Sequence, residues 1–232
     1  MCGRFSQTQP LAEVVKRFSA KQPSFNAKPS YNVCPGTQRP VIAASGFKLL
    51  KWGFLPGWVS SAPAPSPQPA LLPDLPPPEA APQPREGLIN ARAEGIASRP
   101  AFRAAFYGRR CLVPADGFYE WQQSAGVRTP YRFELRDRAL FAMAGVYEEQ
   151  NGTFAVITCA ASALVRPVHH RMPVILERRH EALWLDPKMR DSETLLPLLR
   201  AYDSALMHGY KVSDLVNDPA NDSPGCLAPR PE

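Results

Sequence analysis

CLVPADGFYEW, at residues 111–121, is the first of four segments rich in apolar, β-branched and aromatic residues. The other three are TPYRFELR (129–136), ALFAMAGVYEE (139–149) and GTFAVITCAAS (152–162). Such runs are typical of β-strands, because branched and aromatic side chains pack well on a pleated surface. The four segments therefore predict a run of sheet strands.

Further strands are expected before this run. YNVCPGTQRPVIAA (31–44) is typical of a turn followed by a strand, and FKLLKWGFLPGW (47–58) of a strand that ends at Gly and Pro. Helices are predicted where apolar residues recur three and four positions apart, over 7–18, 98–108, 180–185 and 192–202, ahead of a turn-rich end. Strands with helices packed outside them indicate an α+β domain on a mostly antiparallel sheet.

The composition breaks between residues 60 and 86, where ten prolines lie between Pro63 and Pro84. Proline fixes φ and removes a backbone donor, so neither a helix nor a sheet can continue through such a segment. We expect a polyproline-like or disordered insertion in a single domain that spans 1–232. A docking segment for a proline-binding partner and a tolerated loop insertion both remain open.

Length and composition limit the class of protein. A chain of 232 residues with 44% hydrophobic residues is long enough for one large domain with a substantial core. No run approaches the roughly 20 apolar residues of a membrane span, and the first residues lack the order of a signal peptide. We therefore expect a monomeric, cytoplasmic protein, associated with the nucleoid if it binds DNA.

Charge and cysteine content narrow the choice of partner. The net charge of +6 is compatible with nucleic acid binding, and equally with a merely basic protein. Five cysteines without a CxxC pair predict neither a disulfide framework nor a zinc site, and no other cofactor is indicated. Cys111 and Cys159 lie in apolar runs and are expected to be buried. Only Cys2 occupies a position where an exposed thiol would be useful.

MCGRFS opens the chain and places Cys2 directly after Met1. If Met1 is removed, Cys2 carries an α-amine and a thiol on adjacent carbons, which together form a bifunctional nucleophile. The alternative is an incidental residue on a frayed terminus, and these six letters alone favour that alternative.

Two further segments carry groups that can move protons. On a strand, Glu120 shares a face with Phe118, while Tyr119 and Trp121 share the other face. A carboxyl group beside apolar side chains has a raised pKa and can shuttle protons, whereas at a sheet edge it would be solvated. His169, or its neighbour His170, follows a predicted strand and can exchange protons near neutral pH.

Polar and aromatic residues elsewhere suit nucleic acid contacts. Asn90 and Arg92 alternate with apolar residues, so an amide and a guanidinium share one face. Arg4 can add a second phosphate contact. The tryptophans of KWGFLPGW, Trp52 and Trp58, can stack on unpaired bases, although core packing is the commoner role of aromatic residues.

In chain order, MCGRF, YNVCPG, WGFLPGW, INARAE, CLVPADGFYEW and HHRMPVIL resemble the motifs of the SRAP (SOS response-associated peptidase) family, which includes abasic-site sensors. The resemblance covers nearly the whole chain except the proline-rich insertion. It implies a single domain with a barrel-like sheet and flanking helices. It also implies that the protein binds single-stranded DNA containing abasic sites, with no metal and no cofactor.

The resemblance further assigns roles to individual residues. Cys2 is the nucleophile, Asn90 positions its α-amine, and Glu120 and His169 handle protons. His169 is preferred to His170 because His169, Arg171 and Pro173 fit the spacing of the family motif. The residues implied to contact DNA are Arg4, Asn32, Trp52, Trp58, Arg92 and Arg171.

The chemistry of an amino-terminal cysteine agrees with these roles. An abasic deoxyribose opens to an aldehyde, with which a partly neutral α-amine condenses to a Schiff base. The neighbouring thiolate then closes a five-membered thiazolidine ring. Two alternatives remain open at this point: a thiol peptidase that removes its own Met1, and a non-covalent reader of single-stranded or modified DNA in which Cys2 is incidental.

Overall fold

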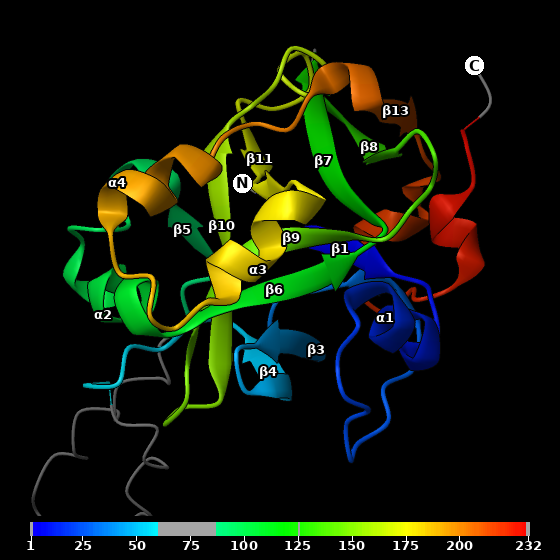
Figure 1. Ribbon diagram of the computed structural model, residues 1–232. Coiled ribbons are helices and arrows are strands. Elements are labelled where there is room, and N and C mark those ends of the chain that lie inside the picture. Colours follow the sequence, from blue (N-terminus) through cyan, green and yellow to red (C-terminus); the bar gives the residue numbers. More distant parts are fainter. Residues whose placement is uncertain (1, 60–86, 125, 231–232) are drawn as a thin grey trace, which may run out of the picture.

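The computed structural model describes residues 2–59, 87–124 and 126–230, which fold into two β-sheets with helices at their periphery (Figure 1). The first sheet is antiparallel at every pairing. Its strands, in spatial order, are β13 (Met207–Lys211), β8 (Val127–Leu135), β7 (Gly117–Ser124), β1 (Arg4–Gln7) and β2 (Ser30–Val33).

The second sheet closes on itself. Its strands are β3 (Gln38–Ala43), β4 (Gly46–Trp52), β5 (Asn90–Arg92), β6 (Arg110–Ala115), β9 (Phe141–Glu148), β10 (Thr153–Ala160), β11 (Arg171–Pro173) and β12 (Ile175–Leu176). Because β10 pairs with both β4 and β9, the order β10-β4-β3-β6-β9 forms a closed but uneven ring. Only the pairings of β10 with β4 and β5 are parallel among those described. The expected α+β class with a mostly antiparallel, barrel-like sheet is confirmed.

The helices are α1 (Leu11–Phe18), α2 (Pro100–Gly108), α3 (Arg178–Leu185) and the short α4 (Ser192–Leu195). The helix predicted over 192–202 is wrong beyond Leu195, where a 3-10 turn takes over. Pro197 explains this end, since its ring clashes with the carbonyl four residues earlier and it donates no hydrogen bond. Strand β13 is not expected from the sequence, because MHGYK lacks a clear apolar alternation.

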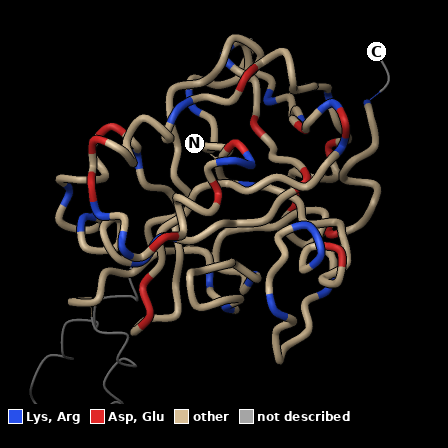
Figure 2. The backbone as a smooth tube through the Cα atoms, viewed as in Figure 1, with Lys and Arg blue, Asp and Glu red and all other residues tan. Residues whose placement is uncertain are grey.

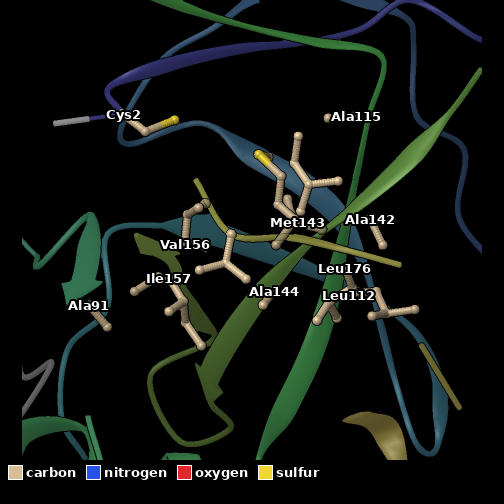
Figure 3. Close-up of a cluster of buried hydrophobic side chains, with 14 of the residues drawn as sticks. Cys2, Ala91, Leu112, Ala115, Ala142, Met143, Ala144, Val156, Ile157 and Leu176 are labelled. Atoms are coloured by element: carbon tan, nitrogen blue, oxygen red, sulfur yellow. The ribbon is translucent and has the colours of Figure 1, made fainter. Parts of the chain in front are cut away.

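One cluster of buried side chains joins the two sheets (Figure 3). Phe5 and Phe118 enter it from the first sheet, and Val113 and Val156 from the second. Cys111 and Cys159 are buried in it as expected. Cys2 belongs to the same cluster, so the start of the chain is anchored in the core.

Two expectations concern the extent of the domain and its relation to membranes. The proline-rich insertion lies at 60–86, outside the described residues. The extent of the single domain over 1–232 therefore stays a prediction. Among the helices that are described, none is long and apolar enough to cross a membrane.

Candidate functional site

Cys2 lies two residues before β1 and has no exposed surface. Both expectations for it, an exposed thiol and a residue on a frayed end, are therefore wrong for the chain that carries Met1. The reason is that β1, which begins two residues after Cys2, is paired on both edges, with β2 and β7, and this pairing holds the start of the chain against the core. Burial raises the pKa of the Cys2 thiol, and the nearby Glu120 carboxylate raises it further.

Asn90 holds the backbone of Cys2. Its side-chain Nδ2 donates a hydrogen bond to the Cys2 carbonyl oxygen at 2.8 Å. Its Oδ1 is buried and has no hydrogen-bond partner in the described part of the chain. Asn90 begins β5, which is fixed by parallel pairing with β10, where Val156 is its partner. A rigid strand thus supplies an open acceptor beside Cys2, and a buried acceptor without a partner is energetically unfavourable.

Glu120 lies on β7 with only 3% of its surface exposed. The predicted division of faces is confirmed: Phe118 belongs to the main core, whereas Tyr119 and Trp121 belong to a smaller cluster on the other face. Burial raises the pKa of Glu120 to about 7, an effect that the charge of Arg128 partly opposes. The alternative of a solvated carboxyl at a sheet edge is therefore excluded.

His169 lies next to this carboxyl group, with its Nδ1 3.7 Å from Oε1 of Glu120. The backbone N–H of Arg171 donates to Nδ1 at 3.0 Å, and the carbonyl oxygen of Arg171 lies 3.2 Å from the same nitrogen, so the backbone of Arg171 holds the ring in place. Burial lowers the pKa of His169, which favours the neutral form of the ring. The ring of His170 stacks on that of His169 at 4.4 Å and is itself exposed.

A cleft of about 690 Å³ opens at this point. Its walls are formed by Gly3, Arg4, Pro35, Glu120, Trp121, Gln123, Arg128, Arg166, Val168, His169 and His170. Three arginines face one carboxyl group, so the cleft favours an anionic ligand. Figure 2 shows Lys and Arg spread over many segments, and the arginines of the cleft indeed come from three distant parts of the chain.

The two predicted stacking tryptophans differ in their surroundings. Trp52 has no exposed surface, and its Nε1 donates to the carbonyl of Ile89 at 2.8 Å. The prediction that Trp52 stacks on a base is therefore wrong, and the core-packing alternative holds, because no part of its ring can be reached. Trp58 is 66% exposed and is accessible to a ligand. Arg92 is also exposed.

Asn32 and Arg171 are engaged within the protein. Asn32 is 3% exposed; its Nδ2 donates to the carbonyls of Asp218 and Asn221, and its Oδ1 accepts from Arg4 at 2.7 Å. The predicted DNA contact of Asn32 is therefore replaced by the anchoring of Arg4. Arg171 is 8% exposed and donates through both terminal nitrogens to the Glu94 carboxylate. Its guanidinium thus ties the segment after β5 to β11.

Trp121 and Arg128 form a wall of the cleft that is not among the residues expected from the sequence. The guanidinium carbon of Arg128 lies 4.6 Å from the centre of the Trp121 ring, and that of Arg4 lies 5.8 Å from it. The indole Nε1 donates to Oδ1 of Asn217 at 2.7 Å, which fixes the ring. The sequence feature that could have predicted this wall is an aromatic residue next to Glu120 on one strand together with an arginine on the strand that pairs with it.

No metal site is found within the described ranges, since no three His, Cys, Asp or Glu side chains lie close enough together there. The cleft therefore combines a carboxyl group and an imidazole within a basic rim. The buried Cys2, whose carbonyl oxygen is held by Asn90, adjoins Gly3 in the cleft wall. This arrangement is that of an α+β protein whose second residue is a buried cysteine near a carboxyl group with a raised pKa.

The chain belongs to the SRAP family, since the family model described as SOS response associated peptidase (SRAP) matches residues 1–219. It is 35% identical over 240 residues to the abasic site processing protein YoqW of Bacillus subtilis, covering 97% of each chain. It is 30% identical to the abasic site processing protein HMCES of Gallus gallus, covering 87% of this chain and 66% of that one. A crystal structure of a protein from Bacteroides thetaiotaomicron has the same fold, with a TM-score of 0.77, 22% identity, and coverage of 99% of this chain and 100% of the other.

Proposed function

We propose that this protein processes abasic sites in single-stranded DNA by trapping them covalently on Cys2 after Met1 has been removed. The names of the relatives support a role in abasic site processing. The observation that carries the covalent step is the geometry of Asn90. Its Nδ2 holds the Cys2 carbonyl, and its Oδ1 is a buried acceptor without a partner among the described residues. A free α-amine on Cys2 is a donor that would satisfy it.

The proposed reaction begins with the open aldehyde form of the abasic deoxyribose. The neutral α-amine of Cys2 adds to the aldehyde carbon, and the resulting carbinolamine loses water to give an imine. The thiol sulfur then adds to the imine carbon, and its proton passes to the nitrogen. The product is a thiazolidine ring, and one water is released overall. Both nucleophiles belong to one residue, so ring closure is intramolecular and fast.

Proton transfer is assigned to Glu120 and His169. A carboxyl group with a pKa of about 7 is present in both protonation states near neutral pH. Because burial raises the pKa of the Cys2 thiol, its proton leaves as the sulfur adds to the imine carbon, and the Glu120 carboxylate can accept it at that point. The protonated form of Glu120 can protonate the departing hydroxyl. His169 lies 3.7 Å from Glu120 and can renew its protonation state from the solvent side of the cleft.

The basic cleft is proposed to hold the DNA strand around the abasic site. Arg4 and Arg128 flank the Trp121 ring and give a wall on which phosphates and bases can both rest. Arg92 follows Asn90 on β5 and is exposed, so it can contact a phosphate next to the reacting sugar. Binding through phosphates predicts affinity that falls with increasing salt.

The test is a denaturing gel with protein whose Met1 removal has been verified by intact mass. The protein is mixed with single-stranded DNA carrying one abasic site or a tetrahydrofuran analogue that has no aldehyde. A denaturant-resistant band that needs both the aldehyde and Cys2 supports the proposal. Salt-sensitive binding without such a band would instead identify a non-covalent reader and overturn the covalent step.

A second candidate is a thiol autopeptidase that removes Met1. The specific observation in its favour is that the Glu120 carboxyl group, with its near-neutral pKa, lies near the Cys2 thiol and can act there as a general base, although its charge also raises the pKa of the thiol. Protein made without methionine aminopeptidase provides the test. Loss of Met1 that is abolished in Glu120→Gln would support this activity, whereas retention of Met1 in the wild-type protein would exclude it.

A further inference from the structure

Trp58 lies at the tip of a tight turn over residues 56–59. The N–H of Val59 donates to the carbonyl of Pro56 at 2.8 Å, which closes the turn. Pro56 is buried, whereas Trp58 is 66% exposed. Leaving an aromatic side chain this size in water forgoes a favourable burial free energy. An exposed tryptophan on a closed turn is a candidate surface on which an unpaired base can stack.

Asn151 holds this turn from the loop between β9 and β10. Its Nδ2 lies within hydrogen-bonding distance of three carbonyl oxygens of the turn region, at 3.0 Å from Leu55, 3.1 Å from Pro56 and 3.3 Å from Val59. The hydroxyl oxygen of Thr153 accepts from the N–H of Leu55 at 3.0 Å. Side chains from the loop between β9 and β10 and from the first residue of β10 thus satisfy backbone groups on both sides of Trp58.

Gly57 shows how closely the turn lies on that loop. A Cβ atom on Gly57 would meet Oε1 of Gln150 at 3.1 Å and Oε2 of Glu148 at 3.2 Å. Glu148 is buried and paired with Arg109 at 2.8 Å, so it has little room to move. A larger residue at position 57 would therefore displace the turn from its support.

We propose that Asn151 is a positioning residue that presents Trp58 to an unpaired base of bound single-stranded DNA. The inference rests on the proposed function for its ligand, and it concerns binding rather than the covalent step. A base stacked on a fixed aromatic ring gains more free energy than one that must first order a mobile loop. Asn151 touches neither the DNA nor the reacting atoms; it acts through the turn.

The chain connects Trp58 to the reacting centre over a short distance. Phe54 and Leu88 exchange backbone hydrogen bonds at 2.9 and 3.0 Å, and Leu88 is two residues before Asn90. Trp58 is four residues beyond Phe54, which allows a reach of at most about 14 Å. Figure 1 shows this segment below α2, on the same side of the molecule as β5. This connection limits how far Trp58 can lie from the strand that carries Asn90, and it is compatible with a contact to a neighbouring nucleotide of the bound strand.

The experiment measures binding and crosslinking separately. Fluorescence anisotropy with single-stranded DNA carrying the tetrahydrofuran analogue gives the Kd, and the gel assay with a true abasic site gives the crosslinking rate at saturating DNA. The variants are Asn151→Ala, Trp58→Ala, their combination, and Gly57→Ala. Asn26→Ala, which changes an exposed asparagine, is the matched control. Thermal unfolding verifies that each variant is folded.

We expect Trp58→Ala to raise the Kd about 5- to 150-fold, which is the range for the loss of one base stack. Asn151→Ala should raise the Kd about 3- to 10-fold and leave the crosslinking rate at saturating DNA unchanged. In the Trp58→Ala background, Asn151→Ala should change the Kd less than about twofold, because the residue acts only through that ring. Gly57→Ala should reproduce the Asn151→Ala effect, and it keeps the test valid if Asn151→Ala does not fold.

The outcomes separate the two proposals. If the wild-type protein binds DNA but forms no crosslink, the proposed covalent function is overturned. The role of Asn151 is then decided by the Kd values from fluorescence anisotropy alone. Additive effects of Asn151→Ala and Trp58→Ala, an unchanged Kd in either variant, or no binding by the wild-type protein would overturn the inference. A fall in the saturating rate alone would also overturn it, because it would place Asn151 in the reaction.

Discussion

The side-chain Nδ2 of Asn90 donates a hydrogen bond at 2.8 Å to the backbone carbonyl of Cys2, a residue 88 positions earlier in the chain. The other end of the same amide, Oδ1, is buried without a partner in the described residues. One side chain thus grips the backbone of Cys2 and leaves an acceptor open beside it. The strand that carries Asn90 cannot shift easily, because it is paired with β10 in the closed sheet.

This contact predicts the effect of Asn90→Ala. The variant should bind abasic single-stranded DNA with nearly the wild-type Kd and should crosslink about 10- to 100-fold more slowly at saturating DNA, because the α-amine is no longer oriented. Single-turnover crosslinking over a range of DNA concentrations separates the two quantities. An unchanged saturating rate would remove Asn90 from the reaction.

Cys2→Ala tests the order of the two bond-forming steps. Once Met1 is removed, the variant still begins with an α-amine and can form the imine, but it has no thiol to close the ring. We expect no denaturant-resistant band with Cys2→Ala, and a band that appears when borohydride is added to reduce the imine. The measurement is the same gel run with and without the reductant. A stable band without reductant would show that the thiazolidine is not the product.

Glu120→Gln should reveal the raised pKa of this carboxyl group through stability. In the folded protein Glu120 keeps its proton up to a pH of about 7, whereas the unfolded chain releases it near 4.5. The folded state therefore binds more protons between these values, and the free energy of unfolding falls as the pH rises through this window. A shift of this size corresponds to at most about 3 kcal/mol.

Glutamine does not titrate, so the free energy of unfolding of the variant does not fall in this way as the pH rises. The melting temperature of Glu120→Gln minus that of the wild-type protein should increase from pH 4.5 to pH 7 and then level off. Both proteins should be prepared so that they retain Met1, the form to which the pKa applies. A difference that is flat across the window would contradict the burial-raised pKa, whatever its absolute size.

The features that follow from short-range pattern could be predicted from sequence. The alternation around Glu120 indicated the correct faces of β7, because side chains on a strand alternate whatever the strand pairs with. The apolar spacing before Phe18 predicted α1 for a similar reason. The order of the motifs indicated the family, and with it the barrel-like sheet.

Features that depend on distant partners could not be predicted in this way. Whether Trp52 faces the core or a ligand depends on the closure of the ring through β10. Asn32 is satisfied by carbonyls 186 and 189 positions away, and Arg171 by a carboxylate 77 positions away. No local sequence pattern encodes these long-range contacts. Trp52, Asn32 and Arg171, which were expected to contact DNA, are therefore found as internal supports.

Glu94→Gln tests one of these supports. The bidentate hydrogen bonds from Arg171 hold the pKa of Glu94 below its ordinary value. A lowered carboxyl pKa adds stability that is present above the unfolded-state pKa and is lost as the pH falls through the folded-state pKa. Because the Glu94 side chain is 56% exposed, we expect the variant to lose only about 1 kcal/mol at neutral pH. The deficit in urea denaturation should disappear in strong acid; a deficit that persists there would point to lost packing instead.

Asn32→Asp should be more damaging than Asn32→Ala, although aspartate is closer to asparagine in shape. The buried Nδ2 donates to the carbonyls of Asp218 and Asn221, and an aspartate would place a carboxylate oxygen against these two acceptors. Alanine only leaves them without a donor, at a cost of about 1–3 kcal/mol. We expect aspartate to exceed this loss even if it forms an ion pair with Arg4, because two buried acceptors would repel it. Urea denaturation of both variants, with exposed Asn26→Asp as the matched control, would contradict this account if aspartate proved the milder change.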